Sequence, residues 1–183
     1  SMTLQNFIGR SGMKQLAGIL DMRIAVLMAI GSPWSKEAVF RLCDLGHELH
    51  VINVFHSSKM KGYLDNQYSL QQSTIKILTG RVQIHEIYSP ADNKLRYLLN
   101  GFALKSLCLK LGIEVLLTLY GGGFATLAYI SGFRPFIIYA VGSDILFSTG
   151  LKKIVNRFTH RSAAKIFTNG VYLSEKAREL TQR

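Results

Sequence analysis

The feature that most constrains the fold is a pair of apolar runs separated by a helical pattern, all in the first third of the chain. Residues 22–30 read MRIAVLMAI, a near-continuous apolar run that ends at Gly31. Such a run is typical of a strand buried on both faces of a parallel sheet. Residues 35–47 carry apolar side chains at helical spacing, and residues 48–55 form a second apolar run. A strand, a helix and a strand within about 34 residues predict a βαβ unit with parallel strands.

The rest of the sequence continues this alternation. We expect further strands at 82–88, 113–120, 134–141 and 165–170, and further helices at 93–112, 124–132, 151–163 and 173–182. The predicted fold class is therefore α/β, with an open, doubly wound, mostly parallel sheet in a single domain. Residues 1–20 precede the first strand, and their spaced apolar residues predict an amphipathic extension to a domain that spans 21–183.

Two of the expected helices have amphipathic patterns. The apolar stripe of the helix at 93–112 is expected to consist of Leu95, Leu98, Leu99, Phe102, Leu107 and Leu111. The helix at 151–163 combines apolar Leu151, Ile154, Val155 and Phe158 with basic Lys152, Lys153, Arg157 and Arg161.

The formal net charge of +11 is unevenly distributed. The excess lies in residues 1–20 (+2), 61–110 (+4) and 151–183 (+6). Basic segments of this kind favour an anionic surface or ligand as partner, although a generally basic solvated surface is the alternative. We expect peripheral attachment to anionic membranes through residues 1–20 or 151–165. Nucleic acid is disfavoured, because the sequence has no recognised binding signature or basic-aromatic repeat.

The chain contains two cysteines, Cys43 and Cys108, without a CxxC motif or a nearby histidine cluster. This predicts packed, reduced thiols in a cytoplasmic protein and no metal site. No apolar stretch approaches the length of about 18 residues that a spanning helix needs.

Three strand ends carry small or polar residues. In parallel sheets, ligands bind outside the carboxyl ends of the strands, at the point where the strand order reverses. The first end has Gly31 and Ser32, followed by Trp34; the second has Tyr120, Gly121, Gly122, Gly123 and Phe124; the third has Gly142, Ser143 and Asp144. Glycines allow close approach of the backbone, and the amides at a helix N-terminus favour phosphate. Each end has a purely structural alternative as a turn, a packing contact or a helix cap.

No complete catalytic motif is present. The first strand end is neither GxGxxG nor GxxxxGK[ST], and GxSxG and HExxH are absent. The five histidines are scattered along the sequence. From the residues alone, this is an α/β domain that binds phosphate or sugar and lacks a self-contained active site.

The ordered set of these segments resembles the N-terminal, acceptor-side domain of GT-B glycosyltransferases, especially the retaining family four. The resemblance rests on residues 22–54 with Gly46-His47-Glu48-Leu49-His50-Val51, on EVLLTLYGGGFATLAYISGFRPFIIYAVGSDIL, and on AAKIFTNGVYLSEKAREL. It implies a Rossmann-like half of a two-domain enzyme that moves a sugar from a UDP- or GDP-sugar to a lipid or glycan in cell-envelope or polysaccharide synthesis. The family's second domain, which supplies most nucleotide contacts, is expected to be absent and this part to be inactive alone.

The resemblance also implies roles for the strand ends. Gly31 and Ser32 would approach the donor diphosphate, and Gly121–Phe124 and Gly142–Asp144 would face the cleft between the two domains. The resemblance implies no permanently bound cofactor. The expected cellular location is the cytoplasm, at the inner face of the plasma membrane. Many relatives carry histidines near these loops, but this chain has Thr118, Tyr120 and Val141 there. A catalytic histidine therefore cannot be assigned, and Asp144 is the only candidate for a catalytic group. The alternatives are a non-enzymatic flavodoxin-like module for a phosphorylated small molecule and a basic nucleic-acid-binding domain.

Overall fold

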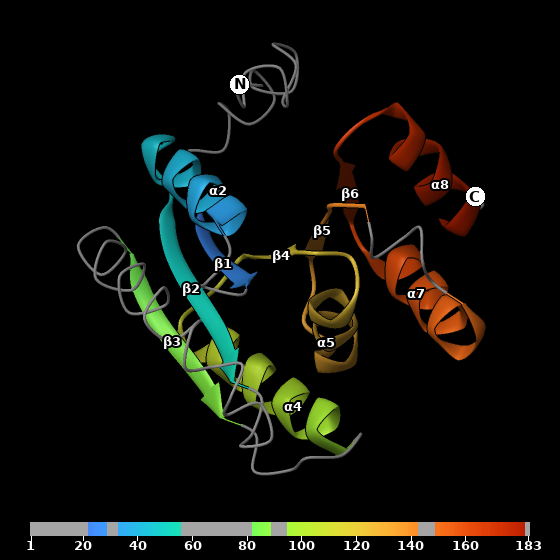
Figure 1. Ribbon diagram of the computed structural model, residues 1–183. Coiled ribbons are helices and arrows are strands. Elements are labelled where there is room, and N and C mark those ends of the chain that lie inside the picture. The colour runs from blue at the N-terminus through green and yellow to red at the C-terminus, as the bar shows by residue number, and fades with distance from the viewer. Residues whose placement is uncertain (1–21, 29–32, 56–81, 89–94, 143–148, 182–183) are drawn as a thin grey trace, which may run out of the picture.

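The computed structural model describes residues 22–28, 33–55, 82–88, 95–142 and 149–181. Within these ranges the chain forms a six-stranded sheet flanked by helices (Figure 1). The strands are β1 (Arg23–Met28), β2 (Glu48–Phe55), β3 (Gln83–Tyr88), β4 (Val115–Leu119), β5 (Phe136–Ala140) and β6 (Lys165–Thr168). The helices are α2 (Pro33–Asp44), α4 (Leu95–Lys110), α5 (Gly123–Ser131), α7 (Gly150–Ser162) and α8 (Val171–Thr181).

The sheet has the order β3-β2-β1-β4-β5-β6, and all neighbouring strands are parallel. This confirms the predicted α/β fold with a doubly wound, Rossmann-like parallel sheet. The order runs outward from β1 in both directions, so it reverses between β1 and β4. A ligand site is expected at the carboxyl ends of the strands beside this reversal.

The core lies on both faces of the sheet, as the run at 22–30 predicts. Side chains of β1 alternate between the two faces. Ala25 and Leu27 pack with residues of α4 and α5, whereas Val26 and Met28 pack with Val39 of α2. Helix α2 thus covers one face of the sheet, and α4 and α5 cover the other (Figure 1).

The predicted apolar stripe of α4 is wrong in part. Leu98, Leu99 and Phe102 are exposed, whereas Leu107 and Leu111 do pack against the core. The face of α4 that turns to the sheet carries Asn100, Leu104 and Cys108, all buried, with Tyr97 beside them. The side chain of Leu95 lies outside the described residues. The helix has apolar residues around most of its circumference, so packing against α5 decides which of them are buried.

In the described part of the chain, no helix is both long and apolar enough to cross a membrane.

Candidate functional site

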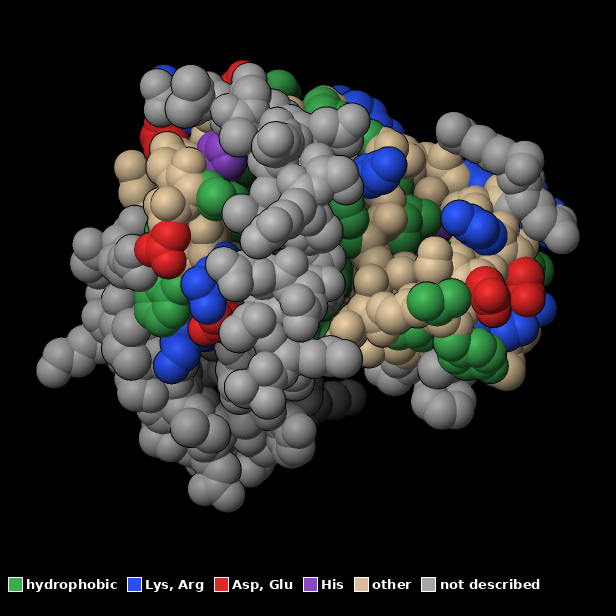
Figure 2. All heavy atoms as spheres, turned by 90° about the horizontal axis from the view of Figure 1, so that it is seen from above, with side chains coloured by type: hydrophobic (Ala, Val, Ile, Leu, Met, Phe, Trp, Pro, Cys, Tyr) green, Lys and Arg blue, Asp and Glu red, His purple; other side chains and the backbone are tan. Residues whose placement is uncertain are grey.

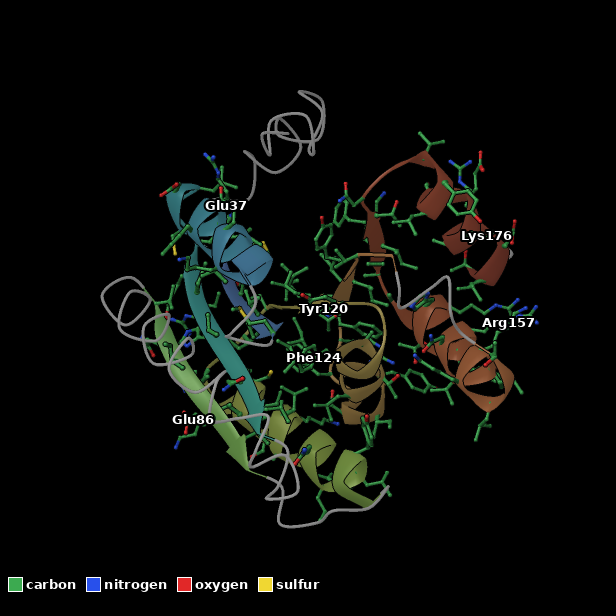
Figure 3. The ribbon with its side chains drawn as sticks, in the orientation of Figure 1. Glu37, Glu86, Tyr120, Phe124, Arg157 and Lys176 are labelled. Carbon is green, nitrogen blue, oxygen red and sulfur yellow. The ribbon has the colours of Figure 1, made fainter. Side chains whose placement is uncertain are left out.

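A cavity of about 210 Å³ opens at the carboxyl ends of β2 and β4, on the face of the sheet that α4 and α5 cover. Its lining comes from three segments that are distant in the sequence: Val54, Tyr97, Asn100, Tyr120, Gly123, Phe124 and Leu127. Figure 3 shows Tyr120 and Phe124 together in the centre of the molecule, whereas the labelled charged residues lie around its periphery. The cavity therefore lies at the edge of the sheet where the strand order predicts a site.

Tyr120 enters the cavity through an unusual backbone conformation. Its φ is +99°, and it is the only non-glycine residue with a positive φ in the described part of the chain. The Tyr120 amide donates to the carbonyl oxygen of Tyr139 over 2.9 Å, which extends the β4–β5 pairing by one residue. The ring centroid of Tyr120 lies 6.4 Å from that of Phe124, with the rings tilted by 45°. Such backbone outliers cluster at ligand sites, where the surrounding fold holds them in place.

Asn100 brings an amide group to an otherwise apolar part of the cavity. The residue is only 3 % exposed, and no hydrogen-bond partner for its Oδ1 is present among the described residues. A buried acceptor without a partner costs about 1–3 kcal/mol, so the position is expected to have a function. The neighbouring Gly101 explains why Asn100 is buried. A Cβ on Gly101 would lie 3.1 Å from Cγ2 of Ile130, so α4 and α5 pack closely at this point.

The three consecutive glycines serve different purposes. A Cβ on Gly121 would lie 3.2 Å from Nε2 of His160 and 3.3 Å from Cβ of Ala140, so this glycine permits close packing. Gly122 precedes α5, and its carbonyl oxygen accepts from the amide of Thr126 over 2.9 Å. Gly123 begins α5 and lines the cavity, where a Cβ would lie 3.6 Å from Oη of Tyr97. Only the third glycine directly faces the space for a ligand.

His160 fixes this loop from α7. It is 1 % exposed, and its Nε2 lies 3.0 Å from the carbonyl oxygen of Gly121. A carbonyl oxygen only accepts hydrogen bonds, so His160 carries a proton on Nε2. His160 is therefore a positioning residue for the loop that carries Tyr120 and Phe124.

The structure brings together three of the predicted site residues: Tyr120, Gly123 and Phe124 line the cavity. Gly121 and Gly122 lie in the same loop without lining it. Gly142 has a φ of +114° and faces Leu173 of α8, so its described contacts are with α8. The other predicted residues, Gly31, Ser32, Ser143 and Asp144, lie outside the described residues, as does the side chain of Trp34.

Sequence reasoning missed Val54, Tyr97, Asn100, Leu127 and His160. A signal for two of them exists in α4, where Tyr97, Asn100, Leu104 and Cys108 recur at helical spacing. No local signal identifies His160, because its partner lies 39 residues away.

The chemistry of the lining is that of a binding site. Each of the seven lining residues is uncharged, and the polar groups are two phenols and one amide. Aromatic rings and an amide suit a ring with both apolar faces and hydroxyl groups, and a cavity of about 150 Å³ already holds one benzene ring. Among the described residues, no group of three potential ligands for a metal ion is found. The thiol of Cys108 on α4 is unreactive, since burial raises its pKa to about 12.

A second polar cluster lies at the amino ends of β1 and β2. Arg23 Nε lies 3.0 Å from Glu48 Oε2, Glu48 Oε1 lies 3.2 Å from His50 Nε2, and His50 Nδ1 lies 3.1 Å from His85 Nε2. Desolvation raises the pKa of Glu48, but the hydrogen bonds from Arg23 and His50 outweigh it and hold the pKa below its ordinary value. Burial and the charge on His50 lower the pKa of His85. This cluster links three strands, and none of its residues lines the cavity.

Comparison with known proteins matches the chain to no protein-family model and to no curated protein.

Proposed function

We propose that this chain is the acceptor-side domain of a glycosyltransferase that transfers a sugar from a nucleotide-sugar to a lipid or glycan acceptor. The observation that carries the proposal is the cavity at the carboxyl edge. Its lining is uncharged, its volume of about 210 Å³ is that of a site for one ring, and it presents Asn100 beside three aromatic rings. In this proposal the rings of Tyr120 and Phe124 contact the apolar faces of a sugar, and the side-chain amide of Asn100 forms a hydrogen bond with a sugar hydroxyl.

Two further features support the proposal. The strand order reverses next to the cavity, as it does at ligand sites of doubly wound sheets. The sequence segments that resemble GT-B enzymes include the loop from Tyr120 to Phe124, which supplies much of the lining. The sequence resemblance is the basis for two further parts of the proposal. These are the donor contacts at Gly31 and Ser32 and the candidate catalytic group of Asp144. A second domain would supply the nucleotide site.

A second candidate function is that of a non-enzymatic module for a phosphorylated small molecule. The observation that favours it is the start of α5 at Gly123, in the lining of the cavity, without a side-chain cap. Helix N-termini favour anions through their free amides and the helix dipole. The absence of a cation among the lining residues favours the neutral sugar over this candidate.

Saturation-transfer NMR on the 183-residue chain tests the binding step. The probes are the methyl glycosides of glucose, galactose and mannose, each compared with the corresponding sugar 6-phosphate. We expect transfer to at least one neutral glycoside, and loss of that transfer in Phe124→Ala. Binding of sugar phosphates alone would favour the second candidate, and binding of neither class would contradict both.

The enzymatic step is tested with the product of the complete reading frame. It is incubated with UDP- and GDP-sugars in the presence of lipid and glycan acceptors, and released nucleotide is measured. We expect release that depends on an acceptor and is lost in Asp144→Asn. Release that is unchanged in that variant would remove Asp144 from the proposed site.

A further inference from the structure

Among the described helices, the net positive charge is concentrated in α4 and α7. Helices α4, α5 and α7 contain no Asp or Glu, whereas they carry exposed cations at Lys105, Lys110, Lys152, Lys153 and Arg157. In contrast, α2 and α8 each carry two basic and two acidic residues. Figure 2 shows the side of the molecule where α2 and α8 lie, and acidic and basic side chains are intermixed over them. The excess charge of the described helices therefore lies on α4 and α7.

Helix α7 turns its apolar face outward. Leu151, Ile154 and Phe158, spaced at i, i+3 and i+7, are 68 %, 54 % and 54 % exposed. The opposite side of the helix packs against the protein through Asn156, Thr159 and His160, which are all buried. A surface helix of a globular protein normally has the reverse arrangement, with apolar residues inside. Arg157 of the same helix lies at the outer edge of the molecule (Figure 3).

Helix α4 repeats the arrangement. Leu98, Phe102 and Leu109, spaced at i, i+4 and i+11, are 50 %, 74 % and 64 % exposed. Leu104 and Cys108 face the core from the other side of the helix. Helix α5 packs against both α4 and α7, so the helices that carry the two apolar stripes share α5 as a neighbour. Large apolar side chains exposed in this number mark an interaction surface.

We propose that this surface docks on an anionic lipid bilayer. The surface, called here the α4–α7 face, comprises Leu98, Phe102, Lys105, Leu109, Lys110, Leu151, Lys153, Ile154, Arg157 and Phe158. Leucine and phenylalanine side chains enter the boundary between headgroups and acyl chains, while lysine and arginine reach the anionic headgroups with their charged ends.

Charge complementarity favours an anionic bilayer over other partners for this face. A second copy of the chain that docked through the same face would bring like charges together in a symmetric contact. Nucleic acid would use the cations but would leave the six exposed apolar side chains of the two stripes in water. A lipid surface uses both kinds of side chain. This inference is independent of the sugar-binding proposal, because its residues do not line the cavity.

Co-sedimentation with vesicles tests the inference on the whole chain. One set of vesicles is an equal mixture of phosphatidylcholine and phosphatidylglycerol, and the other is phosphatidylcholine alone. We expect binding to the anionic vesicles at low salt and at least tenfold weaker binding to the neutral ones. High salt should weaken the binding strongly, because it screens the exposed charges. Sedimentation with neither set, or equal sedimentation with both, would overturn the proposal.

Matched variants locate the contact. Two double variants remove apolar side chains from the face: Leu151→Ser with Phe158→Ser on α7, and Phe102→Ser with Leu109→Ser on α4. Each should reduce vesicle binding at least fivefold while the thermal midpoint of unfolding stays unchanged. The control is Val171→Ser with Tyr172→Ser on α8, whose side chains are 78 % and 61 % exposed on a charge-balanced helix. Binding should be unaffected there.

The competing attachment through residues 1–20 is tested with Arg10→Gln and Lys14→Gln in the same chain. The proposal predicts that these variants retain most of the binding. Loss of binding in them, with full binding in the α4 and α7 variants, would overturn it. Preferential binding to a short DNA duplex in place of vesicles would also overturn it.

Discussion

Nε2 of His160 lies 3.0 Å from the carbonyl oxygen of Gly121 and joins α7 to the glycine loop. We expect His160→Ala to lower the free energy of unfolding by about 2–4 kcal/mol, because it removes a buried hydrogen bond and leaves a cavity. His160→Gln keeps a donor and should lose less. Urea unfolding measures both variants. Equal losses in the two, or a loss below about 0.5 kcal/mol in His160→Ala, would contradict the assigned role.

The packing around the glycine loop predicts opposite outcomes for two neighbouring substitutions. Gly121→Ala places a Cβ against Nε2 of His160 and Cβ of Ala140, so it should destabilise the protein by about 1–3 kcal/mol. Gly123→Ala meets only ordinary contact with Oη of Tyr97 and should leave stability unchanged or raise it by about 0.4–1 kcal/mol. Gly123→Ala should nevertheless weaken glycoside binding, since it reduces the space in the cavity. Similar stabilities for the two variants would be inconsistent with the loop geometry.

Substitution of Asn100 should affect ligand binding but not the stability of the fold. In Asn100→Leu the buried amide, whose Oδ1 has no partner among the described residues, is replaced by an apolar group of similar size. The free energy of unfolding should stay within about 1 kcal/mol of the original value or rise, because the desolvation cost of the amide disappears. Binding of methyl glycosides should be lost. A destabilisation above about 2 kcal/mol would mean that Asn100 serves the fold rather than a ligand.

The His50–His85 pair makes stability depend on pH. Burial and the charge on His50 lower the pKa of His85 below its ordinary value of 6.5, so the unfolded chain binds a proton there before the folded chain does. The free energy of unfolding should therefore fall as the pH drops below about 6.5, and the loss is complete once the pH passes the lowered pKa of the folded state. Above about pH 7.5 His85 contributes no slope, since it is neutral in both states.

Unfolding in urea at several pH values measures this slope. His85→Gln should flatten it between about pH 6.5 and pH 5.5, where Glu48 is largely ionised in both states. An unchanged slope in the variant would place the pH dependence elsewhere in the protein.

The sheet could be predicted from the sequence because its central strands β1, β4 and β5 are short, mainly apolar runs. The run at 22–30 predicts a strand buried on both faces, and the structure confirms this for β1. The parallel, doubly wound order follows from the alternation of strands and helices. The local sequence pattern is therefore sufficient to predict these strands and their parallel order.

The orientation of α4 could not be predicted, since apolar residues occur around most of that helix. Leu98 and Phe102 satisfy the helical period as well as Leu104 and Cys108 do, yet only the second pair is buried. Contacts with α5, such as the close approach at Gly101, select the buried face. The same tertiary choice brings Asn100 into the cavity, and its helical spacing with Leu104 and Cys108 does not by itself show that this face is the buried one.

The loop at 120–124 could be predicted as part of a site, because three glycines follow a buried strand. The division of roles among the glycines could not be predicted. It depends on His160 and Tyr97, which the chain brings in from α7 and α4.

The central claim is that the cavity at the carboxyl edge binds one neutral sugar ring. The most direct measurement is a titration of the ¹⁵N-labelled chain with methyl glycosides, followed by ¹H–¹⁵N correlation spectra. We predict saturable shifts of the amides of Tyr97, Asn100, Gly123 and Phe124, and the loss of these shifts in Asn100→Leu. Saturable shifts confined to other residues, or the same shifts in Asn100→Leu, would contradict the claim.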